Sequence, residues 1–313
     1  MSPARRVAKP DPKQAGGTSG RPVFLLVDGH AHAYRAFHAI RSLSSPDGEP
    51  TNAIFGFVKA MQRLAATCSP SHAAVVWDGG LARERLAVLP GYKANRPPMP
   101  RDLECQFDGL AAWVRANGWR SLCAEGVEAD DWIGGLARMG EAAGASVVIS
   151  TSDKDFMQLV GERIRLLNPA DRGGELLGPE QVVAKTGVQP HQIVDWLSLI
   201  GDSVDNIAGV PGVGPKTATA LLGRFGSCAG IYEHLDQVTP PRVRDALAGA
   251  RETLARNRRL IALREDAAEA VSLPELRISD ANGDALRKLY GRWGFRSLLA
   301  AVTPEPANQG ELW

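Results

Sequence analysis

The chain has 313 residues, 44% of them hydrophobic, which is enough to bury one large core or two smaller ones. Its 36 Lys and Arg nearly balance its 35 Asp and Glu, so the global charge does not indicate a polyanionic partner. The sequence has no run of 18 apolar residues, so no membrane span is predicted, and its cysteines form no Cys-x-x-Cys pair. This cysteine usage argues against zinc and favours a reducing compartment. The cysteines are Cys68, Cys105, Cys123 and Cys228.

The N-terminal stretch, residues 1–21, is polar and rich in Pro, Gly, Lys and Arg. It lacks the apolar segment of a secretory signal. We therefore expect a disordered, mildly basic tail.

Three short apolar runs, at residues 23–27, 74–77 and 146–150, predict buried parallel strands. Each is followed by a helical pattern, at residues 53–65, 105–116 and 156–160 respectively. This alternation predicts an α/β fold with a mainly parallel central sheet flanked by helices. In such sheets ligands bind beyond the carboxyl ends of the strands.

Acidic residues follow each of these strands and also gather at two further places. Asp28 follows the first strand, Asp78 the second, and Asp153 with Asp155 the third. A single Asp in this position commonly caps a turn or the next helix. The other acids are the helix-start cluster Glu128, Asp130 and Asp131, and the pair Asp202 and Asp205 after a helical pattern at 193–200.

Several carboxylates at one edge cannot all remain ionised without a counter-charge. Hard divalent cations, chiefly Mg2+ or Mn2+, prefer oxygen ligands and supply that charge. The nine acids therefore predict a two-metal site for phosphodiester chemistry. The six histidines show no metal-ligand spacing, and we expect His30 and His32 to be structural.

The glycine-rich segment 209–217 differs from a nucleotide-binding loop because Pro215 separates the last glycine from Lys216. We instead predict a hairpin between two helices, in which Gly212 and Gly214 allow positive φ and Pro215 begins a helix. Its bare amides, with Lys216 and Thr217, would bind a nucleic-acid phosphate without reading sequence. A plain helix–helix turn is the alternative.

A local basic surplus lies at residues 81–101, which hold five cations, one acid and Tyr92. We interpret this segment as a clamp for single-stranded phosphate. A second cationic stretch, residues 242–264, reads as an exposed helical face that would extend a duplex footprint.

These features together resemble the 5′-nuclease family, which includes the 5′→3′ exonuclease domain of bacterial DNA polymerase I and the flap endonucleases. The resemblance covers residues 23–299, with motifs in the family's order. The matching segments are 27–30 with 33–39, 91–96, 128–131, 151–155 and 201–218.

The resemblance implies a PIN-like 5′-nuclease fold with two Mg2+ ions, for which Mn2+ can substitute. Asp28, Asp78, Glu128 and Asp130 would serve the first ion, Asp153, Asp155, Asp202 and Asp205 the second, with Asp131 between them. Lys93 and Arg85 match basic residues of a helical arch that neutralise the scissile phosphate, and would be catalytic. The resemblance places DNA contacts at Tyr34, which would stack on a terminal base, and at Arg35, Tyr92, Arg96, Gly212, Gly214, Lys216 and Thr217. The hairpin turn would also hold K+.

The sequence departs from the family's arch motif at two positions. Glu84 stands where an aromatic residue is usual, and Ala87 where Glu is usual. Ala208 also replaces a common proline. These departures concern the arch and leave the set of nine acids unchanged.

The expected domains are the tail 1–21, a nuclease core at 22–178 with the arch at about 81–101, a helical DNA-binding subdomain at 179–300 and a flexible tail at 301–313. The chain stops where polymerase I would continue, which predicts a stand-alone nuclease. The final residues Gln309, Leu312 and Trp313 resemble peptides that dock on the bacterial sliding clamp. Packing of Trp313 onto the nuclease is the alternative.

The function that we expect is a structure-selective 5′→3′ exonuclease and 5′-flap endonuclease for primer or flap removal in DNA replication and repair. It would act as a cytoplasmic, nucleoid-associated bacterial monomer on DNA with 5′ ends, flaps or nicks. Two alternatives remain: a catalytically silent DNA-junction binder of the same fold, and an RNA-directed nuclease.

Overall fold

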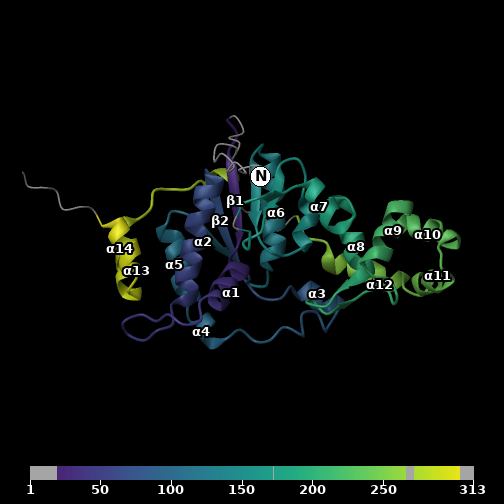
Figure 1. Cartoon of the computed structure of the whole chain (residues 1–313), viewed down its shortest axis with the longest axis horizontal. Coiled ribbons are helices and arrows are strands. Elements are labelled where there is room, and N and C mark those ends of the chain that lie inside the picture. Colours follow the sequence, from purple (N-terminus) through teal and green to yellow (C-terminus); the bar gives the residue numbers. More distant parts are fainter. Residues whose placement is uncertain (1–19, 172, 266–270, 304–313) are drawn as a thin grey trace, which may run out of the picture.

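The computed structural model describes residues 20–171, 173–265 and 271–303. The molecule is elongated, with an α/β body in the middle, a group of helices at one end and a helix pair at the other (Figure 1). Within the described residues, no helix is long and apolar enough to cross a bilayer.

The body is built on a six-stranded sheet of order β3-β2-β1-β4-β5-β6. The first five strands run parallel and the short β6 is antiparallel to β5. The strands are β1 (Val23–Asp28), β2 (His72–Trp77), β3 (Arg120–Cys123), β4 (Ser146–Ser150), β5 (Ile164–Leu167) and β6 (Leu176–Leu177). The predicted α/β class and the three predicted strands are confirmed.

Both faces of the sheet are buried, which explains the continuous apolar run of β1. Phe24 and Leu26 belong to one core cluster, whereas Leu25 and Val27 belong to the other. The first cluster includes α6 (Ala129–Ala142), and the second includes α2 (Asn52–Cys68) and α5 (Phe107–Ala116). The chain enters α1 (Gly29–Ala39) directly from β1.

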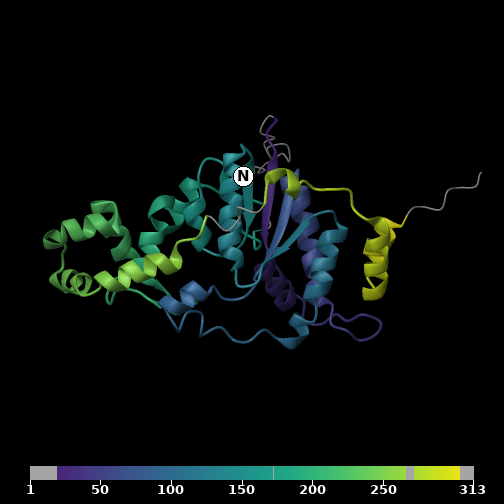
Figure 2. The ribbon, with the colours of Figure 1, turned by 180° about the vertical axis from the view of Figure 1, so that it is seen from behind.

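The helical end begins after α7 (Pro179–Thr186) and extends away from the sheet, as both views show (Figures 1 and 2). A two-residue ladder connects α8 to α9 within it. Its elements are α8 (Ile193–Ile200), β7 (Gly201–Asp202), β8 (Ile207–Ala208), α9 (Pro215–Phe225), α10 (Cys228–Glu233), α11 (Pro241–Ala248) and α12 (Arg251–Ile261). Short 3₁₀ helices occur at Asp155–Leu159, Pro190–Gln192, Leu235–Gln237 and Leu273–Leu276.

The last two helices, α13 (Gly283–Trp293) and α14 (Arg296–Val302), lie at the opposite end of the molecule from α9–α11 (Figure 2). Helix α13 packs on α5, where Trp113 Nε1 donates to Tyr290 Oη at 2.8 Å, and α14 packs on α13. The predicted helical unit at 179–300 therefore differs from the structure, because its last part returns to the α/β body.

Residues 278–282, which we call the strap, precede these helices and form backbone hydrogen bonds with the α/β body. The amides of Ile278, Ser279 and Asn282 donate to the carbonyls of Ser71, Gly118 and Ala116 at 3.1, 3.0 and 2.8 Å respectively. The segment that follows the helical end is thus bound to the α/β body, at the loops before β2 and β3 and at the end of α5, before α13 begins.

The segment 81–101, predicted as a helical arch, is helical only at α3 (Arg83–Val88) and where α4 (Arg101–Glu104) begins. Residues 89–100 contain four prolines and are non-helical. Proline lacks an amide donor and disfavours helix in the residue before it, which explains the difference.

Candidate metal centre

A cleft of about 900 Å³ lies beyond the carboxyl ends of the strands, at the edge where the sequence predicted the acids to meet. Six of the nine predicted acids line it. They are Asp28, Asp78, Asp130, Asp153, Asp202 and Asp205. His30, Tyr34, Arg96 and Lys154 also line this cleft.

The ends of β1 and β2 position the first two acids. Asp28 caps α1 by accepting from the Ala31 amide at 3.0 Å, and its second oxygen accepts from the Thr151 hydroxyl at 3.2 Å. Asp78 accepts from the Ala129 amide at 2.8 Å, at the start of α6. Both aspartates therefore accept a hydrogen bond from a backbone amide at the start of a helix, as a capping residue does, and they also line the cleft.

Three acids of the cleft lie in an environment that resists their ionisation. Burial, with repulsion from Asp78 and Asp153, raises the pKa of Asp28 to about 6. Burial and repulsion from Asp153 raise the pKa of Asp130 well above its usual range. Burial also raises the pKa of Asp153. Raised pKa values in these three acids indicate that the nearby protein cations do not fully offset the cost of burying the carboxylate charges.

Asp155, the remaining predicted acid after β4, does not line the cleft. Its Oδ1 is buried without a hydrogen-bond partner in the described part of the chain. Burial and repulsion from Asp153 raise its pKa well above the usual range. An unpartnered buried carboxylate oxygen beside other carboxylates fits a cation better than a structural role.

Glu128 and Asp131, both predicted as metal ligands, are buried in ion pairs and do not line the cleft. Glu128 Oε2 lies 2.7 Å from Lys93 Nζ and 3.0 Å from Arg85 Nη1. Burial alone would raise the pKa of Glu128, but these two cations outweigh that effect and lower it. Protein cations thus supply the counter-charge at these two positions.

Arg85, predicted to face the scissile phosphate, points into the protein instead, with 6% of its surface exposed. It binds Asp131 through two nitrogens, at 2.7 Å each. The predicted catalytic role of Arg85 therefore does not agree with its position. Its partners come from α6 and α12, which the local motif could not reveal.

Lys93 and Tyr92 are also buried, at 6% and 3% exposure. Lys93 Nζ forms an ion pair with Glu128 and also lies 3.9 Å from Asp130. It therefore contacts the acids from the buried side of the cleft. Tyr92 Oη lies 3.1 Å from Glu128 and 3.3 Å from Asp205, and its one proton is shared between these two carboxylates. The predicted DNA contact of Tyr92 is corrected to a buried hydrogen bond to the acids.

Asp202 reaches the cleft from the end of β7, and Asp205 from the turn between β7 and β8. Lys154 Nζ lies 3.0 Å from Asp202, and Arg96 Nη2 lies 2.7 Å from Asp205. The position of Arg96 is compatible with its predicted DNA contact. The sequence predicts no role for Lys154, although its place between Asp153 and Asp155 is a signal for one.

The two histidines expected to be structural differ from each other. His32 is buried, with Nε2 2.9 Å from Ser150 Oγ, as expected of a structural residue. His30 lines the cleft, its Nδ1 accepts from the Asp78 amide at 3.1 Å, and its ring packs on Phe107 at 4.6 Å. Sequence reasoning missed this placement because spacing alone could not separate the two.

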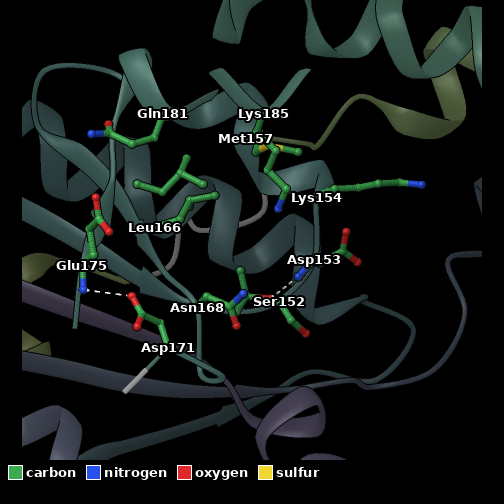
Figure 3. A pocket seen from close by; sticks show the side chains of 12 residues that line it. Ser152, Asp153, Lys154, Met157, Leu166, Asn168, Asp171, Glu175, Gln181 and Lys185 are labelled. Carbon is green, nitrogen blue, oxygen red and sulfur yellow. Dashed lines mark hydrogen bonds between the residues drawn. The ribbon is translucent and has the colours of Figure 1, made fainter. Parts of the chain in front are cut away.

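A second pocket, of about 300 Å³, adjoins the first. Figure 3 shows Ser152, Asp153 and Lys154 on one side of it, with Gln181 and Glu175 further away and Leu166 between them. Residues 152–154 line both hollows, so the short turn after β4 forms the wall between them.

The acids lie near one another but do not form a complete set of metal ligands in this structure. Among the residues that the structure describes, no three His, Cys, Asp or Glu side chains are already gathered closely enough to hold a metal ion. The ion pairs of Asp202 and Asp205 with Lys154 and Arg96 explain part of this openness, because each directs a carboxylate toward a protein cation.

The remaining predicted nucleic-acid contacts lie mainly on exposed surface. Gly212 has φ +80°, as predicted, whereas Gly214 has φ −93° and does not use the left-handed region. Pro215 begins α9 and Lys216 is exposed. Arg35 is exposed on α1, and Tyr34 is half-buried.

Comparison with known proteins places these features in a family. A family model described as "5'-3' exonuclease, N-terminal resolvase-like domain" matches residues 23–187, and one described as "5'-3' exonuclease, C-terminal SAM fold" matches residues 188–284. DNA polymerase I of Pseudomonas aeruginosa is 42% identical over 92% of this chain, and the thermostable DNA polymerase I of Thermus thermophilus is 38% identical over 88%. The aligned part spans 32% of the length of each of these relatives.

A solved structure shares the fold. It is a bacteriophage T5 flap endonuclease in a pseudo-enzyme-product complex with DNA and metal ions, with a TM-score of 0.65 and 21% identity. The match covers 90% of this chain and 97% of that one.

Proposed function

The chain belongs to the 5′-3′ exonuclease family, and we propose that it hydrolyses DNA phosphodiesters near 5′ ends, as a 5′→3′ exonuclease and 5′-flap endonuclease. The observation that carries the proposal is the cleft lined by six carboxylates at the carboxyl edge of the sheet. Primer or flap removal during replication and repair, in the bacterial cytoplasm, is the role that suits this activity.

Seven acids fit divalent cations, for which we propose two Mg2+, with Mn2+ as a substitute. They are Asp28, Asp78, Asp130, Asp153, Asp155, Asp202 and Asp205. When bound, the cations supply the positive charge that stabilises the attacking and leaving oxygens of phosphodiester hydrolysis. The unpartnered oxygen of Asp155 and the raised pKa of Asp28 support this assignment.

The other cleft residues suit a nucleic-acid strand. Tyr34 lines the cleft and presents an aromatic surface on which a terminal base would stack. Arg96 and Lys154 hold Asp205 and Asp202, and become available to phosphate oxygens once cations bind those carboxylates. Lys93, 3.9 Å from Asp130, adds positive charge from behind.

We also propose that the hairpin turn before α9 binds the backbone of a DNA duplex. Apart from the glycine and its chain neighbours, no atom of the described residues lies within 4 Å of a Cβ built at Gly212 or Gly214, so their backbone is open to a phosphate. Lys216 is exposed beside them, with Thr217 next to it. The carbonyls of this turn are where a K+ ion would bind.

The C-terminal residues Gln309, Leu312 and Trp313 lie outside the described residues. Their similarity to clamp-docking peptides supports a proposed interaction of this monomer with the bacterial sliding clamp. Titration of a peptide of residues 300–313 with a bacterial clamp tests it. Absence of binding at high micromolar concentration would contradict the proposal.

The central experiment follows cleavage of a 5′-labelled DNA flap beside a nick, in Mg2+ and in EDTA. We expect a Mg2+-dependent oligonucleotide of flap length, absent with Asp130→Ala and retained with the control Asp236→Ala. Asp236 is an exposed carboxylate away from the cleft. Mononucleotide products would make the enzyme chiefly an exonuclease.

Two other outcomes would overturn the proposal. Tight junction binding without product in Mg2+ or Mn2+ would favour a silent junction binder. Cleavage of an RNA hairpin in preference to the DNA flap would favour an RNA-directed nuclease. Thermal unfolding of Asp130→Ala separates lost chemistry from lost folding.

A further inference from the structure

The buried guanidinium of Arg85 joins three segments that are far apart in sequence. Its Nε donates to the Leu260 carbonyl at 3.0 Å, and Nη2 donates to that of Ala262 at 3.4 Å. Its remaining hydrogen bonds go to Asp131 and Glu128. With five hydrogen bonds to protein atoms, the guanidinium has no donor left for a substrate phosphate.

Both carboxylate oxygens of Asp131 also accept hydrogen bonds from protein donors. Its Oδ2 accepts from Arg85 Nη1, and its Oδ1 accepts from Arg85 Nη2 and from the Arg264 amide at 3.0 Å. The side chain is 4% exposed and does not line the cleft. Both oxygens already have charged or backbone donors, so a metal ion would have to displace a bidentate ion pair to use them.

The contacts of Arg85 form a continuous path from the helical end to the acids. The carbonyls at the end of α12 bind Arg85, and Arg85 binds Glu128 at the start of α6. Glu128 binds Lys93, whose Nζ lies 3.9 Å from the cleft acid Asp130. Helices α3 and α12 contact one another directly, and Figure 1 shows them near one another at the start of the helical end.

We propose that Arg85 is a positioning residue and that Asp131 is its anchor rather than a metal ligand. The pair holds the end of α12 against the start of α6. It thereby determines the positions of Glu128 and of Lys93, which is paired with Glu128 next to the cleft. The activity arms of the test rest on the proposed nuclease function, whereas the stability arm does not.

The stability arm is a double-mutant cycle in EDTA, measured by urea unfolding, with Arg85→Gln, Asp131→Asn and both together. Arg85→Gln leaves the buried Asp131 carboxylate without its cation, and Asp131→Asn leaves the buried Arg85 guanidinium with Glu128 as its one remaining carboxylate partner. We expect each to lower the folded-to-unfolded ratio by about 100-fold, about 3 kcal/mol. The double variant should lose far less than the product of the two effects, because neither charge remains.

A matched control uses an ion pair on the surface of α6. Arg138 Nη1 lies 3.0 Å from Glu141, and both side chains are about a third exposed. Arg138→Gln, Glu141→Gln and their combination should show little coupling. Independent, multiplicative effects at Arg85 and Asp131 would overturn the proposed anchor.

The metal arm measures the Mg2+ concentration that half-saturates flap cleavage. We expect Arg85→Gln and Asp131→Asn to lower kcat by similar factors while shifting half-saturation by no more than about 2-fold. If Asp131→Asn alone raised it about 10-fold or more, Asp131 would be a ligand and the proposal would be wrong.

The DNA arm measures flap affinity and its salt dependence in Ca2+. A positioning residue predicts that Arg85→Gln leaves the slope of log Kd against log salt unchanged. A slope reduced by about one would show a phosphate contact and refute the assignment. If the unaltered protein cleaves no flap, the proposed function fails, yet the stability cycle still decides the role of the pair.

Discussion

Replacing Asp28 with Asn should stabilise the metal-free protein at neutral pH while abolishing cleavage. Burial, with repulsion from Asp78 and Asp153, raises the pKa of Asp28 from 3.8 to about 6. The difference corresponds to about 3 kcal/mol, since each pH unit is worth about 1.4 kcal/mol. Asn keeps the shape and can still accept from the Ala31 amide that Asp28 caps.

The direction in which the free energy of unfolding changes with pH follows from proton binding. Between pH 3.8 and 6 the folded protein holds a proton on Asp28 that the unfolded chain has released. The free energy of unfolding therefore falls as pH rises through this window and levels off above it. Between pH 5 and 7.5 Asp28 alone contributes a loss of about 1.4 kcal/mol, roughly half of the whole effect.

The assay is urea unfolding in EDTA at pH 5 and 7.5. We expect Asp28→Asn to be more stable than the unaltered protein at pH 7.5, by up to about 3 kcal/mol. The exposed control Asp47→Asn should change little. Added Mg2+ should stabilise the unaltered protein more than the variant, because a ligand that binds only the folded state adds to its stability.

Two results would refute this reasoning. One is a free energy of unfolding that does not fall between pH 5 and 7.5 in EDTA. The other is a variant Asp28→Asn that is less stable than the unaltered protein at pH 7.5. Either would mean that Asp28 is already compensated in the metal-free fold, so the cleft does not lack positive charge.

Three further predictions concern the hairpin, the ladder before it and the docked C-terminal helices. Lys216→Ala should weaken DNA binding and reduce the salt slope by about one with kcat unchanged, and an unaltered slope would contradict a phosphate contact. Gly209→Ala should cost about 1–3 kcal/mol in urea unfolding, because its Cβ would lie 2.3 Å from the carbonyl carbon of Ile200; an unchanged midpoint would show that the ladder relaxes freely. Tyr290→Phe should cost about 1–3 kcal/mol because the indole donor of Trp113 loses its partner, and a stability equal to that of the unaltered protein would show that water replaces the hydroxyl.

Sequence reasoning predicted the elements whose signal is local. The apolar runs of β1, β2 and β4 are continuous because both faces of the sheet are buried. The strands β3 and β5 were missed because each has four residues, and β3 is partly exposed along its length. The helix pattern at 105–116 predicted α5, although the structure places α4 before it as a separate helix.

The acid site was predictable to the extent that strand ends determine it. Asp28, Asp78 and Asp153 meet because parallel strands end at one edge. The orientation of Arg85 was not predictable, because it depends on the Leu260 carbonyl, 175 positions away along the chain. No local pattern of charge distinguishes a cation that faces solvent from one that a distant helix buries.

The strap at residues 278–282 makes the helical end a doubly tethered insertion rather than a terminal appendage. The chain leaves the body after α7 and returns to it through the strap and α13, so both flanks of the insertion are anchored. A single protease cut within α8–α12 should therefore leave two fragments that remain associated. Such a nicked protein would migrate as one species under native conditions and separate only in denaturant.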